Sequence, residues 1–77
     1  MNELLVKIRF LIPSLPRAEK AFAQALLENP EAITHLTLAD IARESNSSDA
    51  SIIRFCKRMG YPGYSDLKQA FTAAHAE

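Results

Sequence analysis

The apolar residues of this chain recur at intervals of three and four along nearly its whole length, and this spacing is the strongest constraint on its fold. The first example contains Leu4, Leu5, Ile8, Leu11 and Ile12. Such spacing places side chains on one side of an α-helix, whereas a half-buried strand alternates apolar and polar residues. No run alternates with period two for long enough to indicate a strand. The sequence therefore predicts an all-α protein.

Prolines, glycines and capping residues divide this pattern into about six short helices. A residue before proline avoids helical angles, whereas serine and threonine favour the N-cap. The expected helices cover residues 3–12, about 16–29 with Pro16 in the first turn, 31–35, 38–45, 49–59, and 66 onward with Ser65 as the cap. The last segment, TAAHAE, reads as an unfinished helix, so we expect a domain that belongs to a longer protein.

The same spacing predicts which side chains form the core of a compact helical bundle. The expected inward positions are Ala18, Phe22 and Ala25 or Leu26, then Leu38, Ile41 and Ala42, then Ile52, Phe55, Cys56 and Met59, and finally Leu67 and Phe71. Val6 and Phe10 lie off the main stripe of the first helix. They indicate either a wide core-facing surface or an additional dimer contact.

Composition excludes several classes of protein. Seventy-seven residues, 48% of them hydrophobic, form one domain, 1–77, with a modest core. One cysteine excludes a disulfide framework, and one cysteine with two separated histidines does not suit a metal site. No serine, histidine and acid are arranged for nucleophilic catalysis, and no glycine-rich phosphate loop or long apolar segment is present. We therefore expect a cytoplasmic protein without cofactor, enzymatic activity or membrane association.

Two of the predicted helices form a helix-turn-helix. Residues 38–45 and 49–59 are separated by a turn of about three residues, in which Asn46 suits a positive φ. Ser48 is a good N-cap, and Asp49 places a negative charge in the first turn of the helix. In such motifs the second helix enters the major groove of DNA.

The outward side of residues 49–59 carries groups that suit DNA. Arg54 can form two hydrogen bonds with guanine, and Ala50 and Ile53 can contact thymine methyl groups. Lys57 and Arg58 lie farther along, where phosphate contacts are expected. Ser48 and Ser51 provide short hydroxyl donors, with Ser51 expected to face outward beside Arg54. The complete set of candidate DNA-binding residues is Ser48, Asp49, Ala50, Ser51, Ile53, Arg54, Lys57, Arg58 and Lys68.

Other interpretations of this basic helix remain open. The net charge is zero, and residues 48–68 carry only four basic against two acidic side chains. A basic helix face is often merely solvated, in which case the chain is a helical protein–protein interaction module. RNA binding is a third alternative, although the aromatic residues are not spaced as a stacking platform.

The segments LPRAEKAFAQALLENPEAI and TLADIARESNSSDASIIRFCKRMGYPGYSDLKQAF resemble the N-terminal domain of the RpiR family of bacterial transcription regulators. The resemblance covers about residues 15–71. Its most specific part is SDASIIRFCKRMGYPGYSDLK, and ENP at residues 28–30 is a second landmark. This chain departs from the family pattern at Asn46 and Ser47, where a glycine and a branched apolar residue are usual, and at Ala18 and Pro62.

The resemblance implies a six-helix, homeodomain-like helix-turn-helix domain without a β wing that binds double-stranded operator DNA. It maps the DNA-contacting helix onto Asp49 to Met59 and its contact positions onto Ser48, Ser51 and Arg54. It also implies control of sugar or phosphosugar catabolism by a homodimer or higher oligomer. In full-length relatives a C-terminal sugar-isomerase-type domain, absent from this sequence, senses the phosphosugar effector.

Overall fold

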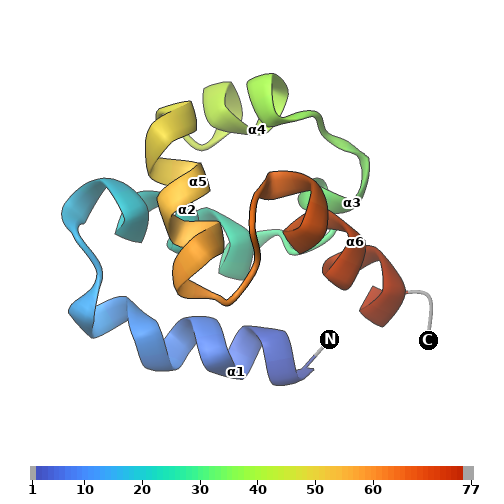
Figure 1. The fold of residues 1–77 in the computed structure, drawn as a ribbon, viewed down its shortest axis with the longest axis horizontal. Coiled ribbons are helices and arrows are strands. Elements are labelled where there is room, and N and C mark those ends of the chain that lie inside the picture. Colours follow the sequence, from blue (N-terminus) through green and yellow to red (C-terminus); the bar gives the residue numbers. More distant parts are fainter. Residues whose placement is uncertain (1, 76–77) are drawn as a thin grey trace.

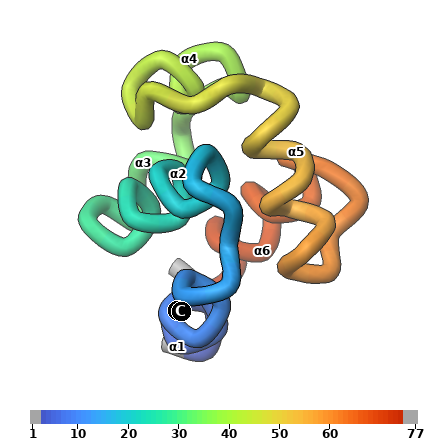
Figure 2. Tube along the Cα trace, turned by 90° about the vertical axis from the view of Figure 1, so that its left-hand side faces the viewer, coloured from blue at the N-terminus to red at the C-terminus, as the bar shows by residue number. Residues whose placement is uncertain are grey.

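The computed structural model describes residues 2–75, which form six α-helices, one 3-10 helix and no strand. In chain order the elements are α1 (Asn2–Leu11), η1 (Ile12–Ser14), α2 (Arg17–Glu28), α3 (Ala32–His35), α4 (Leu38–Glu44), α5 (Asp49–Arg58) and α6 (Tyr64–His75). The prediction of an all-α bundle of about six helices is confirmed. Figures 1 and 2 show α4 and the start of α5 at one end of the molecule and α1 at the other.

The helix ends follow local capping chemistry, and most of the predicted boundaries are therefore close. Thr37 caps α4 by accepting a hydrogen bond from the Asp40 amide at 3.2 Å. Asn29, just before Pro30, is the C-cap of α2. Two predictions differ from the structure. Pro16 is the N-cap of α2 and does not lie in its first turn. Helix α6 begins at Tyr64, so Ser65 lies inside the first turn and does not cap the helix as predicted.

The core lies between α2, α5 and α6, and each of these helices contributes a fully buried phenylalanine. Phe22 and Phe55 meet edge to face, with ring centroids 5.4 Å apart and planes at 77°, a geometry worth about 0.5–1.5 kcal/mol beyond its buried area. The predicted inward residues of α5 and α6 are all buried: Ile52, Phe55, Cys56, Met59, Leu67 and Phe71.

The predicted inward face of α2 was wrong at its first position. Ala18 is exposed, and the buried face instead comprises Glu19, Phe22, Ala23 and Leu26. The last three of these follow Glu19 by three, four and seven residues, which is the spacing of one helix face. Phe22 and Leu26 are buried as predicted, whereas Glu19 takes the inward position expected of Ala18 and brings a carboxylate into the interior.

The first helix packs on the core through a narrow stripe. Ile8 is fully buried, whereas Val6 is 63% and Phe10 is 84% exposed. The wide core-facing surface considered for this helix is therefore wrong. Lys7 provides a second attachment, because its Nζ donates a hydrogen bond to the Met59 carbonyl oxygen at 2.9 Å. None of the helices among residues 2–75 is long and apolar enough to cross a bilayer.

Candidate nucleic-acid interface

The turn between α4 and α5 has a defined hydrogen-bond pattern. The Ser47 amide donates to the Ala42 carbonyl oxygen at 2.9 Å, and the Asn46 amide donates to that of Arg43 at 3.3 Å. Asn46 has a φ of 54°, as predicted. This combination is a Schellman motif, which satisfies the last carbonyls of α4 and reverses the chain. The geometry fixes where α5 begins relative to α4.

Both ends of α5 are capped by hydrogen bonds between residues that are close in sequence. The Ser48 hydroxyl oxygen accepts a hydrogen bond from the Ser51 amide at 3.1 Å, which confirms Ser48 as the N-cap. At the other end Gly60 has a φ of 97°, and the Tyr61 amide donates to the Cys56 carbonyl oxygen at 2.9 Å. A second Schellman motif therefore ends α5, with Met59 as the C-cap. Asp49 lies in the first turn of α5, as expected.

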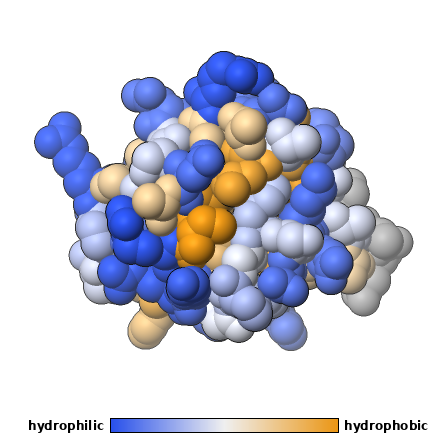
Figure 3. Space-filling view, turned by 45° about the horizontal axis from the view of Figure 1, so that its top comes forward, coloured by the Kyte–Doolittle hydropathy of each residue, from blue (hydrophilic) through white to orange (hydrophobic). Residues whose placement is uncertain are grey.

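The outward face of α5 presents exposed basic groups. Ala50, Arg54, Lys57 and Arg58 are exposed, and the side chains of Arg54 and Arg58 retain 58% and 46% of their accessible surface. Figure 3 views the molecule from the α4 end, where hydrophilic residues surround a narrow hydrophobic strip. Exposed positive charges on one face of a helix are suited to binding a polyanionic ligand.

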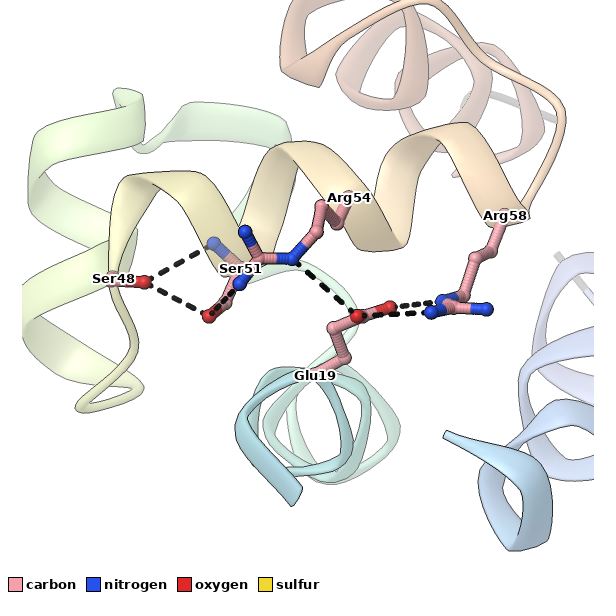
Figure 4. Close-up of polar contacts among 5 residues, drawn as sticks. All are labelled: Glu19, Ser48, Ser51, Arg54 and Arg58. Carbon is pink, nitrogen blue, oxygen red and sulfur yellow. Dashed lines mark hydrogen bonds and ion pairs between the residues drawn. The ribbon is translucent and has the colours of Figure 1, made fainter. Parts of the chain in front are cut away.

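Glu19 of α2 connects the two arginines of α5 (Figure 4). The residue is 1% exposed, and its carboxylate accepts hydrogen bonds from Nε of Arg58 and, at 3.4 Å, from an Nη of the same guanidinium. Nε of Arg54 lies 3.7 Å from the second carboxylate oxygen. Burying a carboxylate is costly unless it is paired and hydrogen-bonded, and this pairing meets that condition.

Ser51 was predicted to face outward, but it is buried. Its residue is only 2% exposed, and its hydroxyl accepts hydrogen bonds from the Ser48 hydroxyl at 2.9 Å and from an Nη of Arg54 at 3.3 Å. The hydroxyl therefore supports Arg54 from within the protein. The i, i+3 spacing of Ser48, Ser51 and Arg54 brings the three groups onto one side of the helix.

Two further candidates have different surroundings from those expected. Ile53 is partly buried and packs against the core, so little of its side chain is available to a ligand. Lys68 lies on α6, and its Nζ donates a hydrogen bond to the Leu36 carbonyl oxygen at 3.0 Å. Lys68 therefore holds the segment between α3 and α4 in addition to any contact with a ligand.

Cys56 is a structural thiol. The side chain is fully buried on the inward side of α5. Burial is the main reason why the thiol pKa rises to about 11, and the nearby charge of Asp66 acts in the same direction. A thiol with so high a pKa is a poor nucleophile. Within residues 2–75, no three His, Cys, Asp or Glu side chains form a metal-binding group.

Sequence reasoning missed Glu19. An acidic residue on a predicted helix is ordinarily assigned to solvent. A signal was nevertheless present, because Glu19 is followed by apolar residues three, four and seven positions later. Its pairing with Arg54 and Arg58 spans more than thirty residues of sequence and depends on how α2 crosses α5, which no local pattern contains.

The chain is similar to known transcription regulators over most of its length. It is 34% identical to the HTH-type transcriptional regulator HexR of Pseudomonas aeruginosa over 68 residues, which are 88% of this chain and 24% of HexR. The chain therefore spans about a quarter of the length of this curated relative.

Solved structures with the same fold include NanR of Vibrio vulnificus complexed with ManNAc-6P, with a TM-score of 0.89 and 33% identity over 95% of this chain and 28% of NanR. The N-terminal domain of ybbH from Bacillus subtilis matches with a TM-score of 0.79 and 36% identity over 86% of this chain and 80% of that one. The family described as "Helix-turn-helix domain, rpiR family" matches residues 2–77. The chain thus belongs to the rpiR family of helix-turn-helix domains.

Proposed function

We propose that this domain reads the sequence of double-stranded DNA by inserting α5 into the major groove. The observation that carries the proposal is the presentation of Arg54, which is more than half exposed and is held on one side by Ser51 and Glu19. Arginine is the side chain that most often discriminates guanine in the major groove. Arg54 is therefore assigned base recognition, with Ala50 beside it for apolar contact.

The remaining exposed groups of the site are assigned to the DNA backbone. Lys57 and Arg58 follow Arg54 toward the end of α5, where side chains approach phosphates. Ser48 and Asp49 lie at the start of the helix, where the free amides of the first turn can also meet a phosphate. Lys68 can contribute positive charge from α6 while it holds Leu36.

The proposal extends to the process that is regulated. NanR of Vibrio vulnificus, which shares this fold, is complexed with a phosphorylated sugar, ManNAc-6P. By this relationship we assign the chain to a bacterial regulator of sugar or phosphosugar catabolism. Such a regulator acts in the cytoplasm as a homodimer or higher oligomer and senses its effector through a C-terminal sugar-isomerase-type domain. Catalysis is not part of the proposed function.

The test begins with selection from a randomised pool of duplexes of about 20 base pairs, because specific sites of helix-turn-helix dimers cover one to two helical turns. Arg54→Ala is expected to lose about 1–3 kcal/mol of discrimination between the selected duplex and a shuffled duplex. Lys57→Ala is expected to weaken the binding of both duplexes equally and to lower the salt slope by about one.

Gel-shift competition measures both quantities, and Arg9→Ala on α1 is the control for loss of one exposed positive charge. Unchanged discrimination in Arg54→Ala contradicts the assigned role.

A second candidate function is a protein–protein interaction module, which the exposure of Val6 and Phe10 favours. Salt titration separates the two functions, because phosphate contacts make DNA affinity fall steeply with salt. A chain that binds no duplex even at low salt supports the interaction module.

A further inference from the structure

Glu19 combines three properties that make it more than a packing residue. It is almost completely buried, its carboxylate faces two arginines, and both arginines belong to the helix that we assign to DNA. The side-chain nitrogen and oxygen atoms buried among residues 2–75 all have hydrogen-bond partners. The acid is therefore integrated into the packing between α2 and α5.

The partners of Arg54 determine which of its nitrogen atoms remain available. Nε faces Glu19 at 3.7 Å, and one Nη donates to the Ser51 hydroxyl at 3.3 Å. Figure 4 shows the guanidinium lying between these two groups on the side of α5 that faces α2. The second Nη makes neither of these contacts. Arg54 therefore meets a ligand with the tip of its guanidinium, and the side chain is partly ordered before binding, which lowers the entropic cost of recognition.

Arg58 interacts more closely with the Glu19 carboxylate than Arg54 does. It donates to both carboxylate oxygens, whereas Arg54 lies beyond hydrogen-bond distance of either. The carboxylate therefore guides Arg54 by charge while Arg58 holds the carboxylate in place. A stronger bond between Glu19 and Arg54 would have to be broken before DNA could be read.

We propose that Glu19 is a positioning residue for DNA recognition, which orients Arg54 toward the bases and keeps it from binding phosphates indiscriminately. This inference rests on the proposed function. The negative charge of Glu19 beside the interface lowers the affinity for every DNA duplex equally. The orientation that it gives Arg54 favours one sequence. Glu19 therefore lowers general DNA affinity and raises discrimination between sequences.

The experiment uses the duplex enriched by the wild-type chain from the randomised pool, together with a shuffled version of it. Glu19→Gln retains the shape of the side chain and removes its charge. It is expected to bind the shuffled duplex about threefold more tightly. Its discrimination between the enriched and the shuffled duplex is expected to fall by about five- to tenfold. Glu28→Gln is the matched control, because Glu28 is an exposed acid on α2, roughly two and a half turns later and on the opposite side of the helix.

A double-mutant cycle distinguishes positioning from a purely structural role. If Glu19 acts through Arg54, Glu19→Gln causes no further loss of discrimination in an Arg54→Ala background. A structural role would instead lower the melting temperature of Glu19→Gln and leave the discrimination of the folded protein unchanged. Equal losses in the wild-type and Arg54→Ala backgrounds would overturn the proposal.

A second pair of variants keeps the proposal testable if Glu19→Gln does not fold. Arg58→Gln leaves Glu19 with Arg54 as its remaining arginine partner, so Arg54 is drawn toward the carboxylate. This variant is expected to lose about fivefold more affinity for the selected duplex than Lys57→Gln, which removes the same charge from the same helix. Equal losses in the two variants contradict the proposal.

The outcomes also separate this inference from the proposed function. A wild-type chain that enriches no sequence overturns the proposed function, and the role of Glu19 falls with it. A wild-type chain that enriches a sequence which Glu19→Gln reads equally well overturns the positioning role alone.

Discussion

The carbonyl oxygen of Leu36 is a single acceptor on which two side chains of α6 converge. The Tyr64 hydroxyl donates to it at 2.6 Å, and the Lys68 Nζ donates at 3.0 Å. The bonds join α6 to the segment just before the helix-turn-helix. Burial is the main reason why the Tyr64 pKa rises to about 12, and the charges of Cys56 and Asp40 act in the same direction.

Tyr64→Phe is expected to lower the free energy of unfolding by about 1 kcal/mol at neutral pH. The Tyr64 pKa is higher in the folded than in the unfolded chain, so the stability that it contributes is complete below pH 10 and is lost as the pH rises toward 12. Tyr64→Phe should therefore lose less stability than the wild type over this range. Urea unfolding at several alkaline pH values measures the difference.

Tyr61→Phe is the matched control, because it removes a phenolic hydroxyl from the neighbouring turn and leaves the Leu36 carbonyl untouched. The same pH dependence in wild type and Tyr64→Phe would contradict the assignment.

Single residues were predictable where their role is local. The positive φ of Asn46 and the cap at Ser48 each depend on neighbours within a few positions, and each prediction is confirmed. Glu19 and Ser51 were not predictable in this way. Their burial depends on α2 packing against α5, and that contact is set by the whole core.

Among the elements, α5 is terminated by a glycine in the left-handed conformation. The amide of Gly60 donates to the Lys57 carbonyl oxygen at 3.0 Å, and the φ of 97° is one that side-chain-bearing residues rarely adopt. A Cβ at Gly60 would lie 4.0 Å from Lys7 Nζ, so space is available there. The requirement for glycine at this position is therefore conformational.

Gly60→Ala is expected to lower the free energy of unfolding by about 1–2 kcal/mol, the cost of a left-handed conformation for an L-residue. Gly63→Ala is the control, because a Cβ at Gly63 meets no atom within 4 Å and its φ is not positive. Its expected change is within about 0.5 kcal/mol. Equal losses in both variants, measured by urea unfolding, would show that conformation at Gly60 is not the cause.

The existence and order of the helices were predictable because prolines, caps and apolar spacing all indicate the same divisions. Which residues of a helix face inward was less predictable where apolar side chains are small and dispersed. In α2 alanines lie at positions 18, 21, 23 and 25, so several faces have similar hydrophobicity. In α5 the bulky residues lie on one face, and the predicted core side is correct.

For the whole molecule, the contact between α1 and the end of α5 is the longest connection in sequence among the side-chain hydrogen bonds of residues 2–75. Lys7 and Met59 are 52 residues apart. A cation beside the last carbonyls of a helix also interacts favourably with the helix dipole. Lys7 thereby contributes to the position of α5, although α1 lies outside the helix-turn-helix.

Lys7→Met is expected to lower the free energy of unfolding by about 1 kcal/mol, since the hydrogen bond and the charge at the end of α5 are lost together while the aliphatic stem remains. Arg9→Met removes an exposed positive charge from the same helix and is expected to change stability by less than about 0.5 kcal/mol. Thermal unfolding compares the two variants. If Arg9→Met is as destabilising as Lys7→Met, the general charge of α1 is responsible, and not the contact with Met59.

The two ends of the described chain leave the helix-turn-helix clear. Helix α1 begins and α6 finishes toward the end of the molecule opposite to α4 and the start of α5 (Figures 1 and 2). A fluorophore, an affinity handle or a solid support can therefore be joined after α6 without covering Arg54. This arrangement makes the domain suitable for immobilisation on a biosensor chip, with its basic helix directed into the flowing sample.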